Sequence, residues 1–153
     1  MSYPAIASLV PHATPMLLLD RLCAATATTA RCEVRVGETL ALFLRDDGAL
    51  PGWVGIELMA QTVAAWSGYQ GHQRQEEPQI GLLLGARKYQ CHLARLPAGS
   101  LLTIDCEQLL QDGALASFQC YLRCDGELVA EARLSTIQPD AEQLEALLGS
   151  RQA

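Results

Sequence analysis

Residues 51–61 read Pro-Gly-Trp-Val-Gly-Ile-Glu-Leu-Met-Ala-Gln, and this stretch decides the fold of the chain. The apolar pattern that begins here predicts one long helix over residues 53–69. Because its apolar side chains spread around most of the circumference, we expect other structure to enclose the helix. Glu57 and Gln61 lie four residues apart and share one polar stripe. A carboxylate in a buried run is costly unless it is hydrogen-bonded, paired or protonated, so Glu57 is the leading candidate for a functional residue.

Segments with strand character lie on both sides of this helix. Residues 29–36 alternate between apolar and polar side chains, which predicts a half-buried strand. The Asp-Gly pairs at 112–113 and 125–126 favour tight hairpin turns between later strands. Those later strands are predicted over residues 80–92, 100–110, 114–124 and 127–138. The order predicts an α+β fold in which one antiparallel sheet wraps around one central helix.

The connecting segments are predicted from glycines and capping residues. Residues 4–10 are expected to form a short turn or helix, and residues 38–50 a loop with short turns. Gly68 and Gly71 are expected to end the long helix and lead into an exposed polar link. Asp140 is expected to cap a short terminal helix.

Composition limits the classes of function. The 153 residues predict a single domain over residues 1–153, and half of them are apolar. The formal net charge of −6 argues against nucleic-acid binding and against anionic membrane surfaces. No signal peptide and no membrane-spanning stretch are recognisable, so we expect a cytoplasmic protein. The six cysteines lack metal-site spacing, and most are expected to be small apolar core residues with no metal bound.

Two motifs resemble those of a known family. Residues 9–21 read Leu-Val-Pro-His-Ala-Thr-Pro-Met-Leu-Leu-Leu-Asp-Arg, which is similar to the family's Leu-Pro-His-x-x-Pro-Phe-Leu-Leu-Val-Asp-Arg opening. Residues 51–61 match Pro-Gly-x-x-x-x-Glu-x-Met-Ala-Gln at identical spacing. The later segments 85–89 and 97–101 are similar to a strand and turn of the same family. The family is that of the hot-dog fold β-hydroxyacyl-acyl carrier protein dehydratases. A group of predicted hot-dog dehydratases found with aryl polyene biosynthesis shares the Trp-Val-Gly-Ile-Glu pattern.

The resemblance implies dehydration of a 3-hydroxyacyl thioester by an acid and a base. Glu57 corresponds to the family's acid. The family's basic histidine precedes the helix, and counting back from Gly52 places its position at Phe43, in a segment without histidine. His12 matches a histidine of the opening motif and is expected to be a buried, structural hydrogen-bonding residue. The resemblance thus implies half of a catalytic pair.

In this family the two catalytic residues of one site come from different subunits. The resemblance therefore implies a dimer, either with a second copy of this chain or with a paralogous hot-dog subunit whose histidine completes the site of Glu57. Backbone N–H groups at Gly52 and Trp53 are expected to polarise the thioester carbonyl. Arg87 and Lys88, with Arg45 and Arg95, are expected to meet the phosphopantetheine phosphate and an acidic carrier surface. The candidate substrate-binding residues are Gly52, Trp53, Phe43, Gln61, Arg87 and Lys88.

The expected substrate is a thioester of acyl carrier protein or coenzyme A, whose phosphopantetheine belongs to the substrate, and no separate cofactor is expected. Two alternatives remain open. Some hot-dog thioesterases use a carboxylate to activate water, and Glu57, Asp46 or Asp47 would fill that role without a histidine. The chain would instead be a non-catalytic subunit that binds or stabilises the acyl chain if Glu57 is dispensable.

Overall fold

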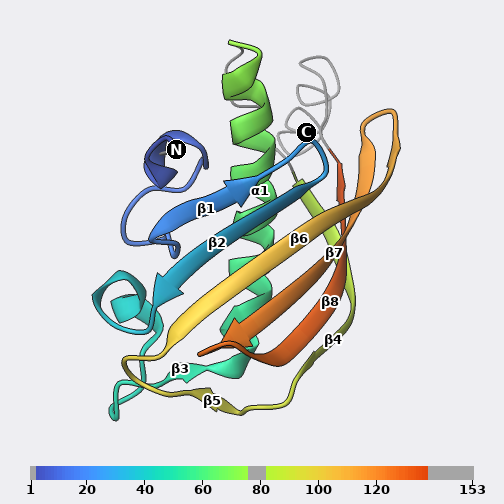
Figure 1. Cartoon of the computed structure of the whole chain (residues 1–153). Coiled ribbons are helices and arrows are strands. Elements are labelled where there is room, and N and C mark those ends of the chain that lie inside the picture. Colours follow the sequence, from blue (N-terminus) through green and yellow to red (C-terminus); the bar gives the residue numbers. More distant parts are fainter. Residues whose placement is uncertain (1–2, 76–81, 138–153) are drawn as a thin grey trace, which may run out of the picture.

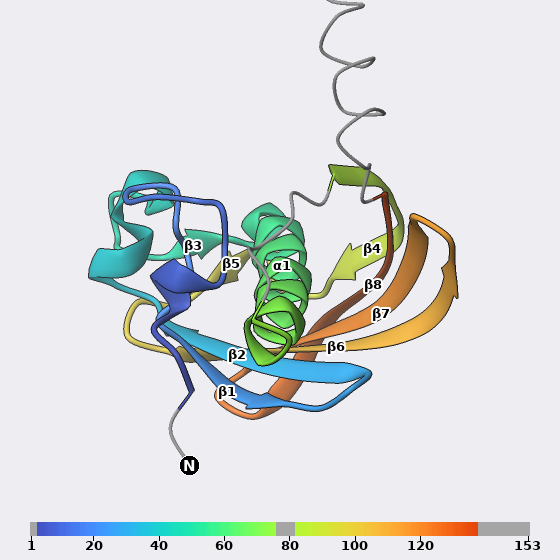
Figure 2. The same ribbon diagram turned by 90° about the horizontal axis from the view of Figure 1, so that it is seen from above.

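A computed structural model describes residues 3–75 and 82–137. Its main feature is a six-stranded sheet in the order β1-β2-β6-β7-β8-β4, in which every neighbouring pair is antiparallel. The sheet curves around a single long helix, α1 (Figures 1 and 2). The strands are β1 (Arg21–Ala25), β2 (Thr29–Arg35), β4 (Leu82–Cys91), β6 (Leu101–Asp112), β7 (Leu115–Cys124) and β8 (Glu127–Ile137). This arrangement confirms the predicted antiparallel sheet wrapped around one helix.

The core lies between α1 (Gly55–Gln73) and the concave face of the sheet. Alternate residues of the strands point inward, because side chains of a strand alternate between its two faces. Leu58 and Met59 of α1 are fully buried, and so are Ile104 and Leu122 of the facing strands. Four of the six cysteines also belong to this core, which confirms their prediction as small apolar residues; they are Cys32, Cys106, Cys120 and Cys124.

The start of α1 is held by a second, two-stranded sheet. β3 (Leu50–Pro51) pairs with β5 (Arg95–Leu96), and the short 3-10 helix η3 (Gly52–Val54) leads directly into α1. The Tyr89 hydroxyl donates a 2.5 Å hydrogen bond to the Gly52 carbonyl oxygen. Burial raises the pKa of Tyr89, so this phenol stays a donor. The edge strand β4 is thereby tied to the residue that opens the helical segment.

The helix does not end where the sequence pattern predicts. It continues through Gly68 and Gly71 to Gln73. Gly68 is instead a point of close approach, because a Cβ there would overlap the backbone carbonyl of Leu9, next to the 3-10 helix η1 (Ile6–Ser8). The missing side chain serves packing and does not terminate the helix. The prediction that these glycines end the helix is wrong for this reason.

The buried amide of Gln61 fastens the N-terminal segment to the middle of α1. Gln61 is fully buried, and its Oε1 accepts a 2.9 Å hydrogen bond from the Leu18 N–H. Its Nε2 donates to the Met16 carbonyl oxygen at 2.8 Å. A buried amide requires partners for both of its ends, and this segment supplies them. Residues 16–18 are thus held at a fixed position beside the helix.

Most of the predicted elements are confirmed, with ends that differ by a few residues. The sequence pattern did not reveal β1, β3 or β5, and residues 38–50 contain the 3-10 helix η2 (Glu38–Phe43) as an ordered turn. The predicted terminal helix after Asp140 lies outside the described residues, as does much of the link before β4. The extent of the domain over residues 1–153 therefore stays a prediction.

Replacing Gly68 with alanine is expected to lower the free energy of unfolding by about 1–3 kcal/mol. The added methyl group would press on the Leu9 carbonyl, and this clash outweighs the ~1 kcal/mol by which alanine favours a helix over glycine. Urea unfolding measures the difference. Gly37→Ala is the matched control, because no atom lies within 4 Å of an added Cβ there. Equal stabilities of the two variants would contradict the close approach.

Gln61→Leu is expected to cost roughly 1–3 kcal/mol of stability, since the buried Leu18 N–H loses its hydrogen-bond acceptor. Gln73→Leu, at the exposed end of the same helix, is the control and is expected to change stability by less than about 0.5 kcal/mol. Amide hydrogen exchange at Leu18 provides a local readout. Unchanged protection of this amide in Gln61→Leu would show that Gln61 does not hold the segment.

Candidate functional site

Glu57 lies in the first turn of α1, and its side chain is 38% exposed. Its Oε1 accepts a 3.1 Å hydrogen bond from Nε2 of Gln61, which confirms that the two residues share a polar stripe. The same oxygen lies 3.4 Å from Nε2 of His12. The carboxylate therefore has neighbours that fix one of its oxygens, while part of the side chain remains open.

His12 is a neighbour of the candidate acid that the sequence does not predict. Its side chain is 30% exposed, and Glu57 is the acidic residue with which it pairs. Its Nδ1 is buried and has no hydrogen-bond partner among the described residues. The prediction that His12 is buried is therefore wrong for its side chain as a whole, whereas its role as a structural hydrogen-bonding residue and not a base stays a prediction. The sequence carries no signal for this contact, because the hydrogen bonds of Gln61 to Met16 and Leu18, which bring His12 to the helix, are tertiary.

An aromatic pair occupies the region where the resemblance implies a histidine. Phe43, at the end of η2, packs edge-to-face against Trp53 with ring centroids 6.1 Å apart and planes at 89°. Trp53 remains largely exposed, at 61%. Trp66 behaves differently, because it packs on Phe118 and donates to the Thr26 carbonyl. Phe43 and Trp53 offer apolar contact area beside the helix start but no group that exchanges protons.

Two of the expected substrate contacts are already used within the protein. The Gly52 N–H donates a 2.9 Å hydrogen bond to the Ala94 carbonyl oxygen, so it is not a free donor for a thioester. The Gln61 amide is fully buried and bonded at both ends, so it braces the site and does not face a substrate. Both expectations need this correction. The role of the Trp53 N–H stays a prediction.

Arg87 and Lys88 are exposed on β4. The register with β8 is irregular between Arg87 and Gln90, and Lys88 adopts a left-handed backbone conformation with φ of 58°. The next residue, Tyr89, touches Gly52, so this part of the strand runs beside the helix start. Both cations are therefore accessible near the edge of the sheet. Among the described residues, neither Arg87 nor Lys88 forms a hydrogen bond or an ion pair with Glu57.

Of the two loop carboxylates that would serve a thioesterase, Asp46 and Asp47, Asp47 is held in contacts within the protein. Asp47 accepts a hydrogen bond from the Ala49 N–H at 3.0 Å and pairs with Arg95 at 2.6 Å. The Ala49 N–H, with the Arg95 charge beside it, holds the pKa of Asp47 below its usual value. These contacts brace the loop against β5. A carboxylate with a lowered pKa and these partners is a poor base. Arg95 is paired with Asp47 and is therefore a weaker candidate for binding the phosphate.

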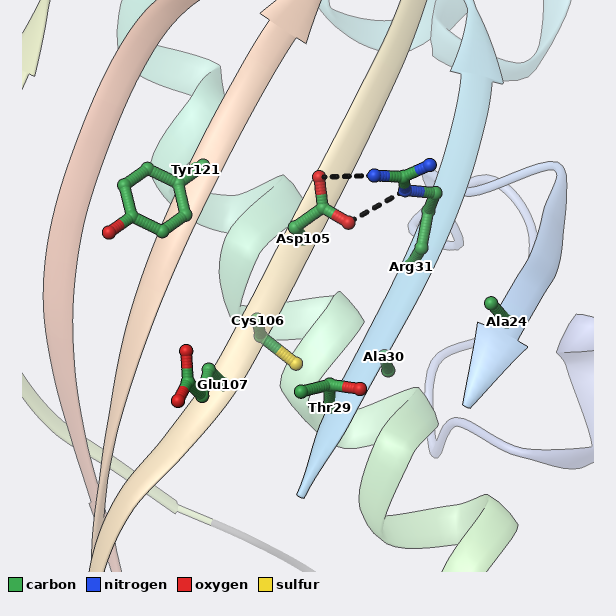
Figure 3. A pocket seen from close by; sticks show the side chains of 8 residues that line it. All are labelled: Ala24, Thr29, Ala30, Arg31, Asp105, Cys106, Glu107 and Tyr121. Atoms are coloured by element: carbon green, nitrogen blue, oxygen red, sulfur yellow. Dashed lines mark hydrogen bonds and ion pairs between the residues drawn. The ribbon is translucent and has the colours of Figure 1, made fainter. Parts of the chain in front are cut away.

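A pocket of about 320 Å³ lies on the convex face of the sheet, away from α1 (Figure 3). Its principal charged groups neutralise one another, since Asp105 pairs with Arg31 at 2.7 Å and with Arg123 at 2.9 Å. Tyr121 and Glu107 flank this pair (Figure 3). The acid and histidine found together, Glu57 and His12, lie on the helix side. We therefore take the helix side as the candidate active site.

Within residues 3–75 and 82–137, no group of three or more His, Cys, Asp or Glu side chains has an arrangement that would hold a metal ion. Among the helices of the same described part, none is long and apolar enough to cross a membrane.

Comparison with solved structures places the fold among known proteins. The chain is 36% identical to a chain of the dehydratase heterocomplex ApeI:P from Xenorhabdus doucetiae, with a TM-score of 0.89 and coverage of 95% of this chain and 98% of that one. A mutant of the phenylacetic acid degradation protein PaaI from Thermus thermophilus is 17% identical with a TM-score of 0.59, covering 78% and 92%. Zebra fish thioesterase superfamily member 2 is 19% identical with a TM-score of 0.63, covering 88% and 91%. The last two similarities show the hot-dog fold alone.

The family comparison gives the more specific result. No curated protein matches the chain. The model of the ApeP-like family, described as ApeP dehydratase, matches residues 4–149 and so includes both sequence motifs and the candidate site. The chain belongs to the ApeP-like dehydratase family.

Proposed function

We propose that this chain is a subunit of a 3-hydroxyacyl thioester dehydratase and contributes Glu57 as the acid. The observation that carries the proposal is the placement of Glu57. It stands in the first turn of α1, partly open, with one oxygen fixed by Gln61 and an aromatic pair close to the helix start. The family membership of the chain fits a dehydratase of polyene biosynthesis.

The chemistry requires two proton transfers. A base removes a proton from the α-carbon, the electron pair forms the α,β double bond, and the bond from the β-carbon to the hydroxyl oxygen breaks. Hydroxide is a poor leaving group, so an acid must donate a proton and let it depart as water. We assign this donation to the Glu57 carboxyl group. The products are then a 2-enoyl thioester and water.

We further propose that the base is a histidine of a different, paralogous hot-dog subunit. Phe43 and Trp53 leave no histidine at the position where the family carries it. The related structure with 36% identity is a heterocomplex of dehydratase subunits, which supports an assembly of two unlike chains. Glu57 is 38% exposed in this protomer, and a partner that covers it would exclude water from the site. β4, the terminal strand of the sheet order, offers an edge for pairing.

The substrate carrier and the location of the protein belong to the same proposal. We propose that Arg87 and Lys88 meet the phosphate of a phosphopantetheine arm, because both are exposed next to the strand segment that touches the helix start. The arm would be that of an acyl carrier protein or of coenzyme A in the cytoplasm. A thioesterase remains the alternative: Asp47 is bound to Ala49 and Arg95, so Asp46 or Glu57 would have to activate the water.

The role of Glu57 is tested in a complex of this chain with a paralogous subunit. Glu57→Gln is expected to lower the rate of 2-enoyl thioester formation by about 10²- to 10⁴-fold, because the amide has no proton to donate. The absorbance of the conjugated enoyl thioester follows the reaction with 3-hydroxyoctanoyl-pantetheine as the probe.

Glu107→Gln is the matched control. Glu107 lies on the convex face and is expected to tolerate the same change without loss of activity. Full activity of Glu57→Gln would show that the chain is a non-catalytic subunit. Release of free pantetheine that depends on Glu57 would instead identify a thioesterase.

A further inference from the structure

We propose that His12 is a positioning residue that orients the Glu57 carboxyl group for proton donation. The inference rests on the proposed function and deepens it by assigning a role to a second residue of the same chain. It begins from the 3.4 Å approach between His12 Nε2 and Glu57 Oε1. This distance is long for a hydrogen bond, but catalytic hydrogen bonds in unliganded sites often shorten when the substrate binds.

The two neighbours of Glu57 act on the same oxygen. Gln61 Nε2 donates to Oε1 at 3.1 Å, and His12 Nε2 approaches that same atom. Oε2 of Glu57 takes part in no hydrogen bond or ion pair with another described residue. The carboxyl proton is less favourable on an oxygen that already accepts hydrogen bonds, because the proton would compete with the donors at that oxygen. The transferable proton is therefore assigned to Oε2, and the donors at Oε1 fix the direction in which Oε2 points.

The surroundings of the imidazole determine which face of it meets the carboxyl group. Nδ1 of His12 is buried and lacks a partner among the described residues, so a hydrogen on this atom would be a buried donor with no acceptor. A neutral imidazole carries its hydrogen on one nitrogen only. The hydrogen is thus assigned to Nε2, the nitrogen that faces Glu57. His12 then presents an N–H and not a lone pair, which fits a donor to Glu57 and does not fit the base that removes the α-proton.

The backbone on either side holds His12 in place relative to the helix. On one side, Leu9 packs its backbone against Gly68 of α1. On the other side, Met16 and Leu18 are hydrogen-bonded to the Gln61 side chain. The segment that carries His12 is therefore anchored to α1 at two points. Such anchoring is what a residue needs in order to hold another side chain in one geometry.

Two substitutions separate positioning from base catalysis. Gln places an amide N–H near the position of Nε2, whereas Leu removes the donor at similar bulk. In the two-subunit complex, with 3-hydroxyoctanoyl-pantetheine as the probe, His12→Leu is expected to lower kcat by roughly 10- to 100-fold. KM is expected to stay within about twofold, and His12→Gln is expected to keep kcat within about threefold of the wild type. A thermal unfolding curve for each variant verifies that it is folded at the assay temperature.

A double substitution tests whether His12 acts through Glu57. The rate of His12→Leu combined with Glu57→Gln is expected to equal that of Glu57→Gln alone, because the histidine has no further carboxyl group to orient. Losses that multiply would overturn the inference, as would wild-type kcat in His12→Leu. A His12→Gln variant as slow as His12→Leu would also overturn it and would identify His12 as a base. A wild-type complex without dehydratase activity would instead overturn the proposed function itself, and this inference with it.

Discussion

The buried amide of Gln61 is the interaction on which the site depends. It joins the backbone at Met16 and Leu18 to the helix that carries it, and it also binds the Glu57 carboxylate one turn earlier on that helix. A side-chain amide that is fully buried must be satisfied at both ends, so the N-terminal segment has little freedom to move away from the helix. This constraint explains why His12 arrives beside Glu57 although the two residues are distant in the sequence. The same side chain, Gln61, therefore holds the N-terminal segment in place and contacts the candidate acid.

Within the described residues of one chain, the candidate site holds Glu57, which we propose as the acid, and His12, which we propose as a donor that orients it. Phe43 and Trp53 form an aromatic contact beside the helix start, and Glu57 remains partly exposed. An acid donor works best where water is excluded, and in this protomer nothing described covers Glu57 fully. A partner subunit that covers the Glu57 carboxyl group and brings a histidine would exclude water from the site and supply the missing base. The similarity to a solved dehydratase heterocomplex is consistent with this division of labour.

The sequence is sufficient to predict the long helix, the hairpins and the antiparallel sheet, because each follows from local periodicity or from turn residues. The prediction fails at Gly68 for a physical reason: the same glycine signal marks a helix end or a close backbone approach, and only the position of Leu9 distinguishes them. The contact of His12 with Glu57 could not be predicted, since it depends on a tertiary brace made by Gln61. Likewise, the spacing of residues 51–61 identifies the candidate acid but gives no sign that the Gly52 N–H is paired with Ala94.

We propose that one catalytic site requires this chain and an unlike subunit together. A titration of this chain with a paralogous hot-dog dehydratase subunit decides the matter, with the initial rate of 3-hydroxyoctanoyl-pantetheine dehydration as the readout. We expect negligible dehydration by this chain alone and a rate that rises until the two chains are equimolar. Full dehydratase activity of this chain by itself would rule out the shared site, because both the acid and the base would then belong to one polypeptide.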